Sequence, residues 1–116
     1  MLVRNVTRGT VLGDRVDSAS ESRQRRRGLL AHDHLPAGSG LWISPCEAVH
    51  TFFMKFPIDV VFLSRRRVVV KVRAHLPPWR MSGSLRAHSV LELPVGTAQQ
   101  TGTQPGDQLE FAEVAP

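Results

Sequence analysis

The stretch CEAVHTFFMKFPIDVVFL, residues 46–63, is the most apolar part of the chain and decides its fold. From His50 to Leu63, nearly every even position is apolar, whereas the odd positions are mixed. A period of two predicts β-strand with the even side facing a core. Fourteen extended residues would span about 46 Å, more than the roughly 35 Å width of such a domain. The sequence therefore predicts two core strands that bend at Pro57, because proline cannot donate a ladder hydrogen bond.

The segments on either side of this stretch are also predicted to be short strands. Apolar and polar side chains alternate over residues 68–75, which predicts a half-exposed strand that forms a hairpin with residues 58–63 through the loop Ser64–Arg67. Further strands are expected at residues 2–6, 11–16, 89–94 and 108–114, and one or two helical turns at 95–102. Six to eight strands predict a mainly β, barrel-like domain, with an α+β fold as the alternative.

One helix is expected in the N-terminal half of the chain. Ser18 precedes Glu21 by three residues, so their side chains can cap the first free amides reciprocally. The helix is predicted from about Ala19 to Arg27, and Gly28 ends it. Its many arginines leave little apolar face for packing.

The composition indicates a single globular domain over residues 1–116. An apolar share of 41% and a charged share of 22% are ordinary for this class, and no apolar run reaches the roughly 18 residues of a membrane span. The charged N-terminus does not resemble a signal peptide as it stands. One cysteine cannot form an internal disulfide, which agrees with a reducing compartment. We therefore expect a cytoplasmic protein without a membrane association.

The positive charge raises the question of nucleic-acid binding. The formal net charge is +5 and the sequence pI is about 11.0. However, the sequence shows no helix-turn-helix, zinc finger or aromatic RNA-binding signature, and it lacks tyrosine. The clusters Arg23–Arg27 and Arg65–Arg67 supply the only support, and an arginine run at a hairpin turn is ordinarily just solvated. Weak nucleic-acid binding therefore remains an alternative and is not the main prediction.

Asp59 is the residue of greatest interest, because its neighbours Ile58 and Val60–Leu63 are all apolar. A carboxylate in such surroundings must be hydrogen-bonded, paired with a cation or protonated. Arg25, Arg80 and Lys55 are the candidate cations. In the structural interpretation, Asp59 ties a turn by accepting backbone amides; in the functional one, it lines a pocket.

Trp79 and Arg80 lie in a predicted proline-containing loop, where binding residues concentrate. Together with Trp42 they would form an aromatic and cationic wall for a small anionic or planar ligand. The alternative is a packed tryptophan that covers the open end of a small barrel. Asp107 follows a predicted turn at Pro105–Gly106, and one hypothesis places it in the same cleft as Asp59.

Cys46 and His50 are four residues apart, a spacing that invites a metal-site hypothesis, with His32, Asp33 and His34 as further ligands. The strand pattern and the absence of a CxxC or HxxxH pair argue against it, so neither a metal nor a cofactor is predicted. Cysteine–histidine catalysis requires contact and an orienting group, and no sequence feature indicates them. We expect a buried Cys46 and a His50 at the edge of the apolar face.

An ordered set of residues resembles the bacterial and archaeal domain-of-unknown-function family 192, over about Val11 to Val114. The set consists of Arg25, Gly28 and Leu29; Met54, Pro57 and Asp59; Leu91, Glu92, Leu93 and Gly96; and Gly102, Gly106 and Asp107. The resemblance implies a small, mostly β single domain without an established activity. Many family members carry an export signal, which this sequence lacks as it stands, and Ser64 with three arginines replaces an acidic, tighter turn.

From these features we expect a non-enzymatic β module that binds a small ligand or a protein partner. The predicted site is shallow and lies near Asp59, Arg80, Trp79 and Thr51. One alternative is an enzyme that uses Asp59 as a general acid or base, which requires a second polar group that converges on it. The other is the weak nucleic-acid binder described above.

Overall fold

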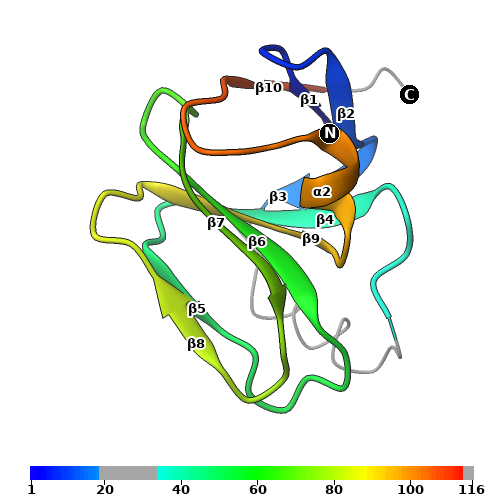
Figure 1. Cartoon of the computed structure of the whole chain (residues 1–116), viewed down its shortest axis with the longest axis vertical. Helices are drawn as coiled ribbons and strands as arrows, with labels where there is room; N and C mark the ends of the chain where they lie inside the picture. The colour runs from blue at the N-terminus through cyan, green and yellow to red at the C-terminus, as the bar shows by residue number, and fades with distance from the viewer. Residues whose placement is uncertain (19–33, 114–116) are drawn as a thin grey trace.

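The computed structural model describes residues 1–18 and 34–113 (Figure 1). The predicted helix Ala19–Arg27 lies outside these residues, as does Glu21 of the capping box. The described residues form ten strands and one short helix: β1 (Leu2–Asn5), β2 (Thr10–Gly13), β3 (Arg15–Ser18), β4 (Ser39–Ile43), β5 (Ala48–His50), β6 (Ile58–Leu63), β7 (Val69–Leu76), β8 (Met81–Gly83), β9 (Ser89–Pro94), α2 (Thr97–Thr101) and β10 (Leu109–Ala112).

The strands are arranged in three sheets. The largest has the order β3-β4-β9-β6-β7, a second has the order β10-β1-β2, and β5 pairs with β8 alone. All neighbours are antiparallel except β3 and β4, which are parallel. The prediction of a mainly β domain is therefore confirmed. Within the described residues, the sheets do not close into a barrel.

The hairpin β6–β7 is confirmed, and β6 is the central element of the fold. All six residues of β6 are buried, because β6 is flanked on both sides by strands and covered on both faces. In the loop, the Arg67 amide donates to the Ser64 carbonyl at 2.9 Å. The predicted strands at 2–6, 89–94 and 108–114 and the helical turns at 95–102 correspond to β1, β9, β10 and α2.

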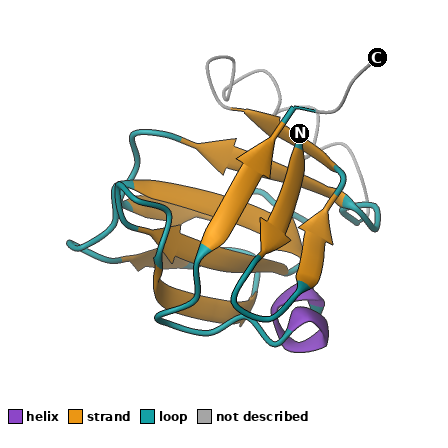
Figure 2. Ribbon diagram, turned by 90° about the horizontal axis from the view of Figure 1, so that it is seen from above, coloured by secondary structure: helices purple, strands orange, loops and turns teal. Residues whose placement is uncertain are grey.

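Two apolar clusters cover the two faces of the large sheet. Val61 and Leu63 pack with residues of the three-stranded sheet, among them Val3. Ile58 and Phe62 point to the opposite face, where the second cluster lies. Figure 2 shows the three-stranded sheet crossing over the larger one. The sequence pattern placed only the even side of β6 in a core. The odd side is buried as well because a second sheet covers it.

Residues 51–57 do not form the predicted first core strand. Strand β5 ends at His50, and a turn follows in which the Met54 amide donates to the Thr51 carbonyl at 3.2 Å. Phe53 has a positive φ of 68°, which is incompatible with a strand. Met54 and Phe56 are nevertheless buried in the second cluster. The apolar period of two therefore arises here from an irregular loop. Such a loop can show the same alternation of apolar residues as a strand.

Candidate functional site

Thr51 joins the loop before β6 to the loop before β8. Its side chain is fully buried. The hydroxyl donates to the Pro77 carbonyl at 2.6 Å and accepts from the Arg80 amide at 3.0 Å. The Thr51 amide donates to the Arg80 carbonyl at 2.8 Å, and its carbonyl accepts from the Trp79 amide at 3.0 Å. One buried threonine thus fixes the backbone of both loops.

Four aromatic side chains gather where these two loops meet, and we call them the aromatic tip: His50, Phe52, Phe53 and Trp79. The Phe53 and Trp79 rings meet edge to face, with centroids 4.6 Å apart. Phe52 lies 6.1 Å from Trp79 and 4.8 Å from the His50 ring. Despite these contacts, Phe53 is 68% exposed and Trp79 is 55% exposed. The tip therefore displays aromatic surface to solvent.

The backbone of the aromatic tip is strained at Phe53 and Trp79. Phe53 has φ 68° and Trp79 has φ 63°. For a residue with a Cβ, this left-handed conformation costs about 1–2 kcal/mol, and such strain persists only where the surroundings enforce it. Here the hydrogen bonds of Thr51 enforce it. No sequence feature distinguishes Phe53, since a phenylalanine inside an apolar run is ordinarily a core residue.

Asp59 accepts hydrogen bonds from backbone amides, as the structural interpretation predicts. The residue is 1% exposed. Its Oδ1 accepts from the His75 amide at 2.9 Å, and its Oδ2 accepts from the amides of Gly96 at 3.1 Å and Ala98 at 2.9 Å. Among the described residues, neither Arg80 nor Lys55 forms an ion pair with it. The charge is compensated by backbone amides.

Those three amides lie in two places, the start of α2 and a bulge in β7, where the regular hydrogen-bonding pattern is interrupted. Gly96, at the N-cap position of α2, has no side chain with which to cap the helix. The pairing of β6 with β7 shifts between Ile58 and Val60, which leaves an extra residue in β7 near His75. Asp59 therefore caps a helix and closes a bulge from the neighbouring strand.

The structure brings together three of the four residues predicted for the site. Thr51, Trp79 and Arg80 are joined by the hydrogen bonds above. Asp59 instead lines a small cavity of about 190 Å³ whose other walls are Ala74, His75, Val95, Gly96 and Gln99. The binding role of all four residues stays a prediction.

Trp42 does not join the predicted wall with Trp79 and Arg80. It lies in β4, and its ring packs against Phe111 with a centroid distance of 4.6 Å. The Arg67 guanidinium lies over the Trp42 ring at 5.0 Å. Trp42 contacts the first apolar cluster because β4 belongs to the large sheet. The sequence carried no signal for this pairing, since Trp42 and Phe111 are far apart along the chain.

Asp107 and Asp59 share no hydrogen-bond partner. Its Oδ2 accepts from Asn5 Nδ2 at 2.9 Å, Arg8 Nε at 3.1 Å and the Gln104 amide at 3.1 Å. Burial alone would raise the pKa of Asp107. The hydrogen bonds from Asn5, Arg8 and Gln104, together with the Arg8 charge, outweigh burial and lower that pKa below its ordinary value. This network ties the C-terminal turn to β1.

Cys46 and His50 have separate surroundings. Cys46 is half-buried against the second apolar cluster, and its thiol donates to the Ala48 carbonyl at 3.0 Å. His50 is exposed and stacks on Phe52. Across residues 1–18 and 34–113, no three His, Cys, Asp or Glu side chains are grouped to hold a metal. His32 and Asp33, two of the hypothetical ligands, fall outside these residues.

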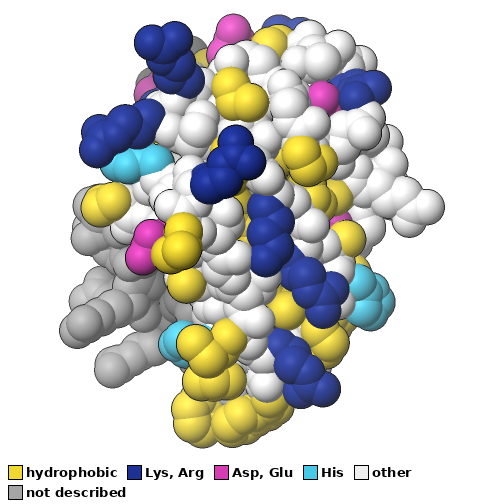
Figure 3. Space-filling view, turned by 60° about the vertical axis from the view of Figure 1, so that its left-hand side comes forward, with side chains coloured by type: hydrophobic (Ala, Val, Ile, Leu, Met, Phe, Trp, Pro, Cys, Tyr) yellow, Lys and Arg dark blue, Asp and Glu magenta, His cyan; other side chains and the backbone are white. Residues whose placement is uncertain are grey.

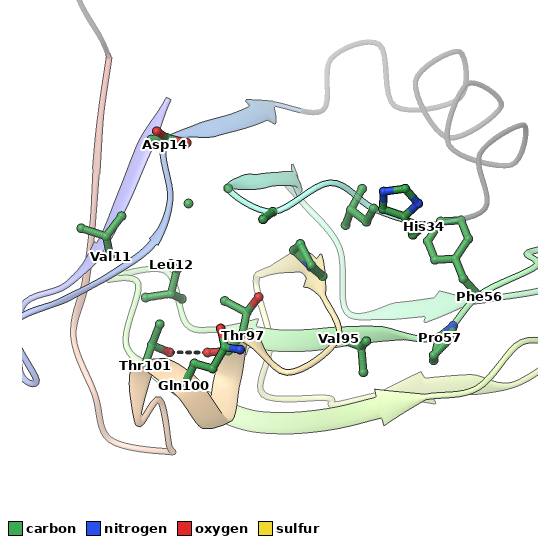
Figure 4. A pocket seen from close by; sticks show the side chains of 15 residues that line it. Val11, Leu12, Asp14, His34, Phe56, Pro57, Val95, Thr97, Gln100 and Thr101 are labelled. Atoms are coloured by element: carbon green, nitrogen blue, oxygen red, sulfur yellow. Dashed lines mark hydrogen bonds between the residues drawn. The ribbon is translucent and has the colours of Figure 1, made fainter.

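A cavity of about 640 Å³ lies beside α2 (Figure 4). We call it the α2 cavity. Figure 4 shows Thr97 and Gln100 on the helix side, Phe56 and Pro57 at one end, and Asp14 at the rim. The complete lining is Val11, Leu12, Gly13, Asp14, His34, Leu35, Ala37, Gly38, Phe56, Pro57, Pro94, Val95, Thr97, Gln100 and Thr101. These residues come from separate segments, so no local motif predicts the cavity.

Within the described ranges, no helix has the length and apolar content needed to cross a membrane.

Comparison with known proteins identifies relatives in archaea. The model of the domain-of-unknown-function family 192, described as an uncharacterised ACR, matches residues 3–111. A UPF0127 protein of Thermococcus sibiricus is 32% identical over 115 residues, which cover 92% of this chain and 72% of the relative. A UPF0127 protein of Pyrococcus furiosus is also 32% identical, over 113 residues that cover 92% of this chain and 95% of that protein. The family resemblance seen in the sequence is confirmed.

Two solved structures have a similar fold. A protein of unknown function from Novosphingobium aromaticivorans has a TM-score of 0.67 and 22% identity, and the match covers 83% of this chain and 72% of that one. A protein from Sinorhizobium meliloti, described as a candidate transcription regulator, has a TM-score of 0.76 and 23% identity, with 94% and 89% covered. At these identities the likeness shows the fold alone.

Proposed function

We propose that this chain, which belongs to the domain-of-unknown-function family 192, is a non-enzymatic module that binds a small amphipathic ligand in the α2 cavity. The observation that carries the proposal is the cavity volume of about 640 Å³. Ligand pockets in proteins typically measure about 300–1,000 Å³ and are mainly apolar with a few convergent polar groups, as this cavity is.

The walls of the α2 cavity suit a ligand with an apolar body and a few hydrogen-bonding groups. Leu35, Phe56 and Val95 supply apolar surface from three separate segments. Gln100 can both donate and accept hydrogen bonds, and Asp14 supplies a carboxylate at the rim. This mixture favours a neutral or singly positive molecule over an anion.

The contacts of Asp59 favour binding over catalysis. A general acid or base must exchange a proton with a substrate, whereas both Asp59 oxygens accept backbone amides inside the fold. The nucleic-acid alternative is also weakened, because Arg67, one of the three loop arginines, packs on Trp42 and Phe111. We further propose a cytoplasmic location, on the basis of the single cysteine.

The proposal can be tested with N-phenyl-1-naphthylamine, a fluorescent probe with an apolar aromatic body and one N–H donor. We expect saturable fluorescence enhancement with the wild-type chain. Val95→Phe should fill part of the cavity and weaken binding by about tenfold or more, equivalent to about 1.4 kcal/mol.

Val6→Phe is the matched control. Val6 is 44% exposed and Val95 is 42% exposed, but Val6 does not line the cavity. Val6→Phe and Trp79→Asn should bind the probe as the wild type does. Equal binding by Val95→Phe, or absence of saturable binding by the wild type, would contradict the proposal.

A further inference from the structure

The aromatic tip forms an apolar end of the molecule, and none of its four residues lines the α2 cavity. Phe53 and Met81 are each 68% exposed, and Trp79 is 55% exposed. Met81 lies opposite His50 in the β5–β8 pairing, so it adjoins the tip. Figure 3 shows apolar side chains gathered at the lower end of the molecule, where Figure 1 places the loops 51–57 and 77–80. Contiguous exposed apolar surface usually marks an interaction site.

The fold holds this apolar surface outward despite the local strain. Both Phe53 and Trp79 have positive φ, and the buried Thr51 binds the Trp79 amide and both polar backbone groups of Arg80. These hydrogen bonds hold the backbone in the conformation that leaves the two rings exposed.

The end of the molecule formed by the aromatic tip is positively charged. The loops 51–57 and 77–80 carry the exposed cations Lys55 and Arg80 and no acidic residue. Lys71 and Arg73 follow along β7, whereas Arg65–Arg67 lie at the opposite end of the β6–β7 hairpin. A partner that complements this charge is anionic. Figure 3 shows Lys and Arg side chains in a row that leads to the apolar end. Arg80 directly follows Trp79, and its guanidinium donates to the Trp79 carbonyl at 3.3 Å.

We propose that the aromatic tip docks on the surface of an anionic lipid bilayer. Tryptophan and phenylalanine insert at the boundary between headgroups and acyl chains, and nearby Lys and Arg side chains bind the anionic headgroups. Two neighbouring loops at one end of the molecule can meet a flat surface together. This is a peripheral contact and requires no membrane-spanning segment.

The ring geometry favours lipid over single-stranded nucleic acid. Nucleic-acid platforms expose flat ring faces on which bases stack. At the tip, the Phe53 and Trp79 rings meet edge to face, and Phe52 stacks between His50 and Trp79. The rings thus form a compact apolar cluster whose outer surface suits insertion into an interface.

The test is co-sedimentation of the full chain with vesicles, supported by tryptophan emission. We compare vesicles of phosphatidylcholine alone with vesicles of equal parts phosphatidylcholine and phosphatidylglycerol. Binding to the anionic vesicles should be at least tenfold tighter, should weaken with added salt, and should shift the tryptophan emission to the blue. Equal binding to both vesicles, or binding to neither, would overturn the proposal.

The double variant Phe53→Asn/Trp79→Asn removes the rings and keeps the backbone, because asparagine tolerates positive φ. We expect a loss of vesicle binding of at least tenfold. Leu85→Asn is the matched control, since Leu85 is 93% exposed and lies in the turn beyond the far end of β8; it should bind as the wild type does. Arg80→Gln should weaken binding severalfold.

Three results would assign the tip otherwise. Unchanged vesicle binding by the double variant would show a purely electrostatic contact. Tighter binding of single-stranded oligonucleotide than of anionic vesicles, lost in the double variant, would assign the tip to nucleic acid. A concentration-dependent dimer in sedimentation velocity, abolished by the double variant, would assign it to a second copy of the chain. Because these variants leave the α2 cavity intact, their outcome is independent of probe binding there.

Discussion

Asp59 and Thr51 are both buried polar residues that bind backbone groups from other segments, yet they hold different kinds of structure. Asp59 accepts amides from the bulge of β7 and from the start of α2, and these contacts join elements of the fold to one another. Thr51 holds two residues in strained conformations, and their side chains are exposed. The comparison teaches that buried hydrogen bonds serve two purposes here, stability around Asp59 and presentation of the aromatic tip around Thr51.

Asp59→Asn should produce the largest loss of stability. The variant removes the charge and places an amide donor against backbone donors, and hydrogen bonds to charged groups contribute about 1.5–3 kcal/mol each. We expect the free energy of unfolding to fall by about 2–4 kcal/mol and the melting temperature by several degrees. Thermal unfolding followed by circular dichroism measures both. Asp14→Asn, at an exposed carboxylate, should change stability by less than about 0.5 kcal/mol; comparable losses in the two variants would refute the structural role of Asp59.

Thr51→Val should come next and should act on the tip as well as on stability. Valine keeps the shape but leaves the Arg80 amide and the Pro77 carbonyl without their partner, at a cost of about 1–3 kcal/mol. Acrylamide quenching of tryptophan fluorescence, to which the exposed Trp79 contributes beside Trp42, should increase as the tip loosens, a change that Asp59→Asn should not cause. Thr51→Ser keeps the hydroxyl and should preserve the quenching of the wild type. If Thr51→Val melts lower but quenches normally, Thr51 does not position the tip.

Asp107 provides a pH-dependent test of a third buried polar group. Its pKa in the folded chain lies below the ordinary value of 3.8, so the folded state binds the proton less tightly than the unfolded state does. Its contribution to stability is therefore present above about pH 4 and is lost as the pH falls through the folded pKa. Between pH 5 and pH 2, Asp107→Asn should lose less stability than the wild type; an identical acid dependence would contradict this assignment.

Phe53→Asn should have the smallest effect and the opposite sign. The side chain is mostly exposed, and asparagine adopts positive φ at lower cost than phenylalanine. The free energy of unfolding should stay constant or rise by up to about 1 kcal/mol. Urea unfolding is the measurement, and Phe56→Asn, at a buried position, should be strongly destabilising by comparison. A clear loss of stability in Phe53→Asn would mean that the tip packs as core.

The sequence predictions succeed for features that neighbouring residues specify and fail for features that depend on distant contacts. The hairpin of β6 and β7 was predictable because alternation and a short loop specify it within neighbouring residues. Residues 51–57 were misassigned because buried Met54 and Phe56 imitate a strand period, while the turn is set by contacts with residues 77–80. Trp42 was misassigned because nothing near it in the chain indicates Phe111 as its neighbour.

By itself, the sequence determined the mainly β class, most strand positions, the family, and the fact that Asp59 needs partners inside an apolar strand. These follow from side-chain periodicity and from the cost of burying an unpaired charge. Only the tertiary structure decided which partners those are, which aromatic residues share the tip, and where a cavity remains. Such features join residues far apart in the chain, as when Asn5 binds Asp107 or Thr51 binds Arg80. A local sequence pattern cannot predict these contacts, because they form only when the sheets pack together.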